Sequence, residues 1–188
     1  MPLQPFERLL LAAPRGAMSR LRIAFYRLLG LQAGQRNRFE RVRCRRLCQI
    51  QLGEFNAFSE GCWLWPEDTA CNKPRIVVGN HNYFNRDVMI DACGSIQIGN
   101  FNMFGPGIYI TDSNHRFDAD HSPSELPMDV GQVRIGNRCW IGAKAVILRN
   151  VVLGDGCVVA AGAVVTKSFP VGSVIGGVPA RLLRSVSE

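Results

Sequence analysis

The chain has 188 residues, 47% of them hydrophobic, with 22 basic and 15 acidic side chains and a net charge of +7. These proportions are typical of one folded domain and exclude a disordered chain. No run approaches the ~18 apolar residues that a membrane-spanning helix needs, and the apolar run LLLAA is followed by Pro14 rather than by a signal-peptide pattern. We therefore expect a cytoplasmic protein.

The first 50 residues form a basic segment. Residues 1–46 hold eleven of the basic residues and two acids, a net charge of +9 against −2 for the remainder. Short helices are predicted over 4–13 and 17–30. The second helix carries one apolar stripe and three flanking arginines: Met18, Leu21, Phe25, Leu28 and Leu29, with Arg20, Arg22 and Arg27.

Two interpretations of this segment stay open. It is either a cap on the end of the fold, or a contact of residues 4–30 with an anionic membrane, which would make the protein peripheral at the inner membrane surface. Nucleic acid binding is not expected, because no aromatic residues alternate with the basic ones.

From residue 51 to residue 176 the chain repeats a six-residue phrase that begins with an aliphatic residue followed by a small one, as in IGNRCW-IGAKAV. Three phrases make one coil, and apolar residues at a fixed short period predict a solenoid in which each coil packs on the next. The apolar positions form three columns: Leu52, Val78, Ile98, Ile135, Leu153 and Val171; Phe58, Phe84, Phe104, Ile141 and Val159; Leu64, Ile90, Ile110, Ile147 and Val165. A fourth column holds Asn56, Asn82, Asn102, Cys139 and Cys157, where stacked amides would satisfy one another.

The seven cysteines are an odd number without paired spacing, so reduced thiols are expected. Cys44 and Cys48 lack a second pair or a nearby histidine, and no metal is predicted there.

Three insertions follow the third strand of their coils, so they should emerge at one corner, where solenoids usually build their binding surface. The largest is a predicted loop over 112–132, and it places His115 just beyond the strand. A histidine can act as a base near neutral pH. Residues 177–188 are expected to form a tail with a short helix or turn.

The segments GPGIYITDSNHRFD, RIGNRCWIGAKAVIL and VLGDGCVVAAGAVVTKSFPVGSVIGGVPARLLR resemble the hexapeptide-repeat acyltransferases, specifically the branch of maltose and galactoside O-acetyltransferases that includes enzymes of bacterial surface-polysaccharide synthesis. The resemblance covers about the C-terminal two-thirds. It implies an all-β, left-handed parallel β-helix, a homotrimer and acetyl-CoA as the donor. Handedness comes from the resemblance alone.

The resemblance also implies roles for individual residues. His115 matches the general base, and the backbone N–H of Ala143 matches the donor to the oxyanion. Asn85 and Asp91 match positions that bind the acceptor. Positions along the acetyl-CoA track are matched by Trp140, Gly142, Ala160, Ala161, Thr166, Lys167, Arg181 and Arg184.

The basic N-terminal segment differs from the maltose and galactoside enzymes, which favours a lipid-linked or nucleotide-linked sugar, or a growing glycan, as the acceptor. Three alternatives stay open. One is a zinc enzyme similar to γ-class carbonic anhydrases that uses His81, His115 and His121. The others are an N-acetyltransferase acting on an amino sugar and a solenoid that serves only as a scaffold.

Overall fold

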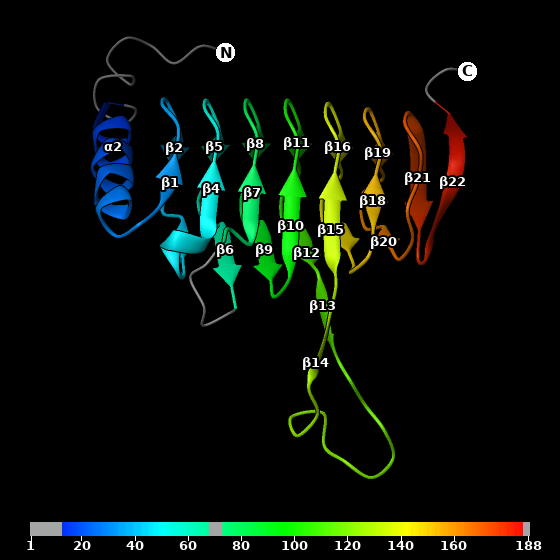
Figure 1. Cartoon of the computed structure of the whole chain (residues 1–188). Coiled ribbons are helices and arrows are strands. Elements are labelled where there is room, and N and C mark those ends of the chain that lie inside the picture. Colours follow the sequence, from blue (N-terminus) through cyan, green and yellow to red (C-terminus); the bar gives the residue numbers. More distant parts are fainter. Residues whose placement is uncertain (1–12, 68–72, 186–188) are drawn as a thin grey trace.

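The computed structural model describes residues 13–67 and 73–185, which form one helix and a parallel β-helix stacked on it (Figure 1). Helix α2 (Ala13–Leu28) lies across one end of the stack, and the C-terminal strands close the other. The predicted left-handed parallel β-helix is confirmed.

Each full coil contributes one strand to each of three sheets, in which all pairs are parallel except the last pair of sheet B. Sheet A contains β1 (Gln32–Ala33), β4 (Ile50–Leu52), β7 (Ile76–Val78), β10 (Ser95–Ile98), β15 (Gln132–Ile135) and β18 (Val152–Leu153). Sheet B contains β2 (Arg38–Phe39), β5 (Ala57–Phe58), β8 (Tyr83–Phe84), β11 (Met103–Phe104), β16 (Trp140–Ile141), β19 (Val158–Val159), β21 (Ser173–Gly177) and β22 (Ala180–Ser185). Sheet C contains β3 (Arg43–Cys44), β6 (Trp63–Pro66), β9 (Met89–Ala92), β12 (Tyr109–Thr111), β17 (Val146–Ile147) and β20 (Val164–Val165). A short 3₁₀ helix, η2 (Leu47–Gln49), joins the first two coils.

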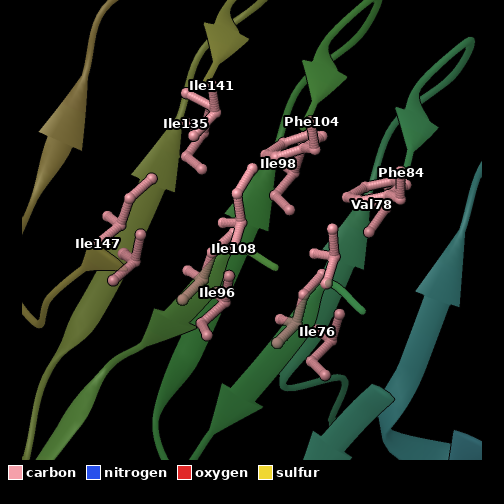
Figure 2. Packing of buried hydrophobic residues seen from close by; sticks show 14 of the residues in the cluster. Ile76, Val78, Phe84, Ile96, Ile98, Phe104, Ile108, Ile135, Ile141 and Ile147 are labelled. Carbon is pink, nitrogen blue, oxygen red and sulfur yellow. The ribbon is translucent and has the colours of Figure 1, made fainter. Parts of the chain in front are cut away.

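The apolar columns pack along the axis of the β-helix, as Figure 2 shows for successive coils. Phe58 and Phe84 stack with ring centroids 4.3 Å apart, and Phe84 and Phe104 follow at 4.4 Å. The predicted columns are confirmed by the strand pairing except at one end, where Phe169 rather than Val171 pairs with Leu153. Val171 is exposed, because the chain is already turning toward β21.

The amide column is also confirmed. Asn82 Nδ2 donates to Asn56 Oδ1 at 3.0 Å, and Asn102 Nδ2 donates to Asn82 Oδ1 at 3.0 Å. The backbone N–H of Cys139 then donates to Asn102 Oδ1 at 2.7 Å. These asparagines are buried, so each amide depends on its neighbours in the ladder for partners.

Replacing Asn82 by Ala is expected to lower the free energy of unfolding by about 3 kcal/mol, because buried groups on the adjacent coils lose their partners. The matched control is Asn80→Ala, which breaks a similar but exposed ladder with Asn100. Water can replace the lost contacts there, and we expect the free energy of unfolding to fall by less than about 1 kcal/mol. Urea unfolding, monitored by circular dichroism, measures the stability of both variants. An equal decrease in the two would show that burial of the Asn82 ladder does not determine its contribution.

The N-terminal segment differs from the prediction in two respects. The helix begins at Ala13, so Pro14 lies in its first turn, where a missing N–H is tolerated. Strands β1 to β3 already form a complete coil, so the β-helix begins at Gln32 rather than at residue 51. The helix predicted over 4–13 lies outside the described residues, apart from Ala13.

The face with which α2 covers the first coil is not its apolar stripe. Ser19 Oγ accepts a hydrogen bond from Phe39 N at 2.7 Å, and Tyr26 Oη donates to Val42 O at 3.1 Å. Ile23 is buried between these contacts. The helix is therefore a cap, and the predicted stripe faces away from the coils.

Two further expectations were wrong. The expected C-terminal tail contains β22, which pairs antiparallel with β21, so Arg181 and Arg184 lie on a strand rather than on a helix or turn. Cys48 is disulfide-bonded, whereas Cys44, Cys62, Cys93, Cys139 and Cys157 are free, so the expectation of reduced thiols fails at Cys48.

Among the described residues, the single α-helix is too short and too polar to cross a bilayer.

Candidate functional site

His115 lies on an arm that projects from the corner between sheets C and A (Figure 1). Within the predicted loop 112–132, β13 (Ser113–His115) pairs antiparallel with β14 (Met128–Val130), and His115 lies opposite Met128. The sequence did not predict this pairing. The His115 side chain is exposed on this arm, where an acceptor can reach it.

Asp112 fixes the root of the arm. Its buried carboxylate accepts hydrogen bonds from the backbone N–H groups of Cys93 and Gly94, at 2.8 and 2.9 Å. Its carbonyl oxygen accepts from Gly131 N at 2.7 Å. A Cβ on Gly94 would lie 2.1 Å from the oxygen of Gly131, so the two segments approach as closely as glycine allows. The position of His115 is thereby tied to the coil before it.

A cleft of about 770 Å³ lies between the arm and sheet C, and it contains both His115 and Asp91. Its walls are Glu67, Arg75, Asp91, Cys93, Ser113, His115, Met128 and Val130. The structure therefore brings the candidate base and one candidate acceptor residue together. Glu67 and Arg75 were missed, although they flank one of the insertions predicted to meet at this corner.

Asp91 has a distinctive environment within this cleft. Its Oδ2 accepts a hydrogen bond from Tyr109 Oη at 2.8 Å, whereas its buried Oδ1 has no hydrogen-bond partner in the described part of the chain. Burial raises the pKa of Asp91, the hydrogen bond from Tyr109 opposes that rise, and the nearby charge of Glu67 adds to it.

His115 also borders a smaller cleft of about 400 Å³ on the other side of the arm. Arg149 Nη2 and Asp129 Oδ2 form an ion pair there at 2.7 Å, and Arg116 lies 3.9 Å from the other oxygen of Asp129. The charge of Asp129 is thus compensated, and the lining of this cleft holds two arginines and two acids, Asp129 and Asp118.

Asn85 does not join His115 and Asp91 within one chain. It follows β8 at the corner between sheets B and C, and it lines a separate cleft with Met18 and Arg22 of α2. Its Oδ1 accepts a hydrogen bond from Arg86 N at 2.8 Å.

The predicted donor track follows that same corner. Gly105, Gly142, Ala160 and Gly176 come directly after paired residues of sheet B and so form a column of small residues. A Cβ on Gly142 would lie 2.5 Å from Ala161 N, so this position has no room for a side chain. An extended chain can therefore approach the backbone closely here.

The backbone of this corner presents two unused donors. Within residues 13–67 and 73–185, the N–H groups of Ala143 and Ala161 donate no hydrogen bond. Trp140, on the strand before them, has 59% of its surface exposed. Two free amides, a column of small residues and an exposed indole suit a thioester-bearing pantetheine chain.

The basic residues predicted at the nucleotide end of the track lie near the last coils. Lys167 Nζ is 5.6 Å from the centre of the Phe169 ring, and Arg181 and Arg184 are exposed on β22. None of these three forms an ion pair with a described acid, and Thr166 beside Lys167 is also exposed. Their charges are available for phosphates.

The candidate base and the candidate oxyanion donor are separated in a single chain. His115 belongs to the arm at the corner between sheets C and A, whereas Ala143 lies at the corner between sheets B and C. Neither of the two clefts bordered by His115 includes Ala143.

The three histidines of the zinc alternative are also separated. His81 stacks between Phe55 and Phe101 at ring distances of 4.7 and 4.8 Å, and His121 Nδ1 lies 3.0 Å from Asp118 Oδ1 on the arm. No group of three potential metal ligands occurs in the part of the chain that the structure describes.

The pattern described as "Bacterial transferase hexapeptide (six repeats)" matches residues 132–167. The chain is 28% identical to galactoside O-acetyltransferase of Escherichia coli K12 over 71% of this chain and 66% of the relative. It is 34% identical to WbbJ of the same organism, by name a candidate lipopolysaccharide biosynthesis O-acetyl transferase, over 55% of this chain and 57% of the relative. The matched regions thus span less than two thirds of these relatives.

The fold is similar to that of a solved hexapeptide-repeat acetyltransferase of Vibrio cholerae O1 biovar eltor in complex with acetyl-coenzyme A. The TM-score is 0.63 at 22% identity, over 90% of this chain and 78% of the other. The repeat, the parallel β-helix and these relatives together show that the chain is similar to hexapeptide-repeat transferases, among them sugar O-acetyltransferases.

Proposed function

We propose that this protein transfers an acetyl group from acetyl-CoA to a hydroxyl group of a sugar. The observation that carries the proposal is the shared cleft of His115 and Asp91, which places a candidate base and a carboxylate on the walls of one hollow. A sugar with neighbouring hydroxyl groups can contact both side chains there, with one hydroxyl facing the imidazole.

In the proposed reaction, a neutral ring nitrogen of His115 removes the proton from the acceptor hydroxyl as that oxygen attacks the thioester carbon. The negative charge that develops on the carbonyl oxygen is stabilised by the N–H of Ala143. The carbon–sulfur bond then breaks, and the thiolate of CoA leaves and takes the proton from the imidazolium. Transfer is direct, without an acyl-enzyme.

We also propose a homotrimer. The support is the separation of His115 from Ala143 and Asn85 at different corners of one chain, because a neighbouring copy can bring one of its corners to the arm of another. Closed rings formed from identical subunits are a common route to such shared sites.

For the acceptor, we propose a lipid-linked or nucleotide-linked sugar, or a glycan, in surface-polysaccharide synthesis. The name of WbbJ supports this class. Both clefts beside His115 also contain guanidinium groups, Arg75 in one and Arg116 and Arg149 in the other, next to acids that line the same walls. Guanidinium groups suit the phosphates that such acceptors carry.

Release of CoA from acetyl-CoA tests the proposed function, with free sugars, nucleotide sugars, amino sugars and isolated surface glycans as acceptors. We expect release that depends on the acceptor and a mass increase of one acetyl group on an oxygen of the sugar. Acetylation of the amino sugars alone would favour an N-acetyltransferase. Failure to bind acetyl-CoA would favour a scaffold, and stoichiometric zinc that is lost in His81→Ala would favour the zinc enzyme.

A further inference from the structure

The outward face of α2 is apolar and lacks a partner in the described structure. Leu28 has 85% of its surface exposed, Leu21 66%, Phe25 57% and Met18 56%. The inward contacts of Ser19, Ile23 and Tyr26 with the first coil leave this face free. Four large apolar side chains on one exposed helix face exceed what a monomer surface usually carries.

Arginines border this apolar face on both sides. At about 3.6 residues per turn, Arg20 and Arg27 lie along one edge of the face and Arg22 along the other. Ala17 and Ala24 lie between Leu21 and the first edge. An apolar centre with cationic edges is the pattern of a helix that lies in a bilayer interface, where arginine stems cross the apolar layer to reach phosphates.

A cleft of about 500 Å³ lies along the edge formed by Arg20 and Arg27. Arg36 and Arg38 of the first coil also line it, and no acidic side chain belongs to its described lining. Arg27 Nη2 is held by the carbonyl oxygens of Ala33 and Gly34, at 2.8 and 2.6 Å, so one guanidinium is fixed in place. Arg38 Nε lies 3.5 Å from Glu40 Oε1, just outside the lining, and the remaining three guanidinium groups around the hollow suit a phosphate headgroup.

The position of α2 leaves its outward face accessible to a flat surface. The helix lies across the end of the β-helix, and the coils extend away from it in one direction (Figure 1). The arm with His115 emerges several coils further along, so it does not separate α2 from a bilayer.

We propose that α2 and the arginine cleft dock this protein on an anionic phospholipid bilayer, with phosphate headgroups in the cleft and Leu21, Phe25 and Leu28 in the acyl region. The positive charge of this end of the protein argues against a second copy of the chain as the partner of the α2 face. Residues 13–46 contain ten arginines and a single acid, Glu40, so two such ends would repel each other. An anionic leaflet supplies the opposite charge.

Co-sedimentation of the full chain with vesicles tests this proposal. The protein should bind vesicles of phosphatidylglycerol and phosphatidylcholine, less tightly as salt increases, and should not bind vesicles of phosphatidylcholine alone. The double substitution Leu21→Glu and Leu28→Glu should weaken binding by at least about tenfold, because two apolar side chains no longer enter the acyl region. Arg20→Glu should weaken it by roughly fivefold or more.

Val152→Glu is the matched control, since it makes the same kind of change at an exposed residue of sheet A, away from α2. It should bind vesicles as the unmodified protein does. Glutamate is a good helix former, and circular dichroism verifies that α2 is retained.

Three outcomes would overturn the proposal. One is equal binding of the double variant and the unmodified protein. Another is that the unmodified protein does not bind vesicles, while light scattering shows that the double variant forms a smaller or larger assembly than the unmodified protein. The outward face of α2 would then contact a second copy of the chain. The third is vesicle binding only after removal of residues 1–12, which would identify that segment as the occupant.

Discussion

Replacing His115 by Ala is expected to lower kcat for acetyl transfer by about 10²- to 10⁴-fold, the usual contribution of a positioned general base. The substitution removes the only imidazole that lines the cleft of Asp91. Because the His115 side chain is exposed and the pairing of β13 with β14 uses backbone atoms, the arm should keep its conformation. Binding of acetyl-CoA, measured by calorimetry, should be unchanged, so the loss would fall on the chemical step.

His121→Ala is the control for this substitution. His121 is also an exposed histidine of the arm, but it is held by Asp118 and borders neither cleft of His115. Its loss should leave kcat within about twofold, as expected for a surface residue. Full activity in His115→Ala would exclude it as the base, and equal losses in the two variants would point to a general disturbance of the arm.

The periodic part of the fold was predictable because its physics repeats. Every coil buries the same positions, so a column such as Phe58, Phe84 and Phe104 can be read as a pattern without knowledge of distant contacts. The amide ladder followed from the same register, since a buried asparagine needs a partner at a fixed spacing. Handedness was supplied only by resemblance.

The ends of the solenoid were less predictable because the repeat stops there. Both faces of α2 carry apolar residues, and contacts of Ser19 and Tyr26 with the first coil decide which face turns inward. At the other end, Phe169 replaces Val171 in the column because the spacing changes before β21. The disulfide of Cys48 could not be inferred from spacing either.

The candidate site was predictable residue by residue but not as an arrangement. The corner insertions and the resemblance led to His115 and Asp91, which the structure brings to one cleft. The same reasoning gave no sign that Asn85 and Ala143 lie at another corner. In a solenoid, strand order separates the corners of one chain, so the proposed site would take its second corner from another copy.

The proposed role of Ala143 depends only on its backbone N–H, so it can be tested by a substitution that removes that group and keeps the turn. Ala145 N donates to Gly142 O at 3.3 Å, and Lys144 between them has a φ of 57°. These features are those of a type II turn, which favours proline at its second position. The preceding coil already carries Pro106 at the equivalent position, since Phe104 pairs with Ile141.

Ala143→Pro is therefore expected to keep the fold and to lower kcat by about 10²- to 10³-fold, the usual effect of losing one oxyanion donor. The matched variant is Ala161→Pro, one coil further along, where Gly162 has a φ of 71° and the alanine N–H is also unused. That amide is proposed to hold the pantetheine arm, so its loss should raise the KM for acetyl-CoA more than it lowers kcat. Steady-state kinetics and thermal unfolding of both variants measure this difference.

If Ala143→Pro unfolds at the same temperature as the unmodified protein and keeps its kcat, the oxyanion donor is not Ala143. If both variants instead show a higher KM for acetyl-CoA and an unchanged kcat, both amides bind the pantetheine arm of acetyl-CoA.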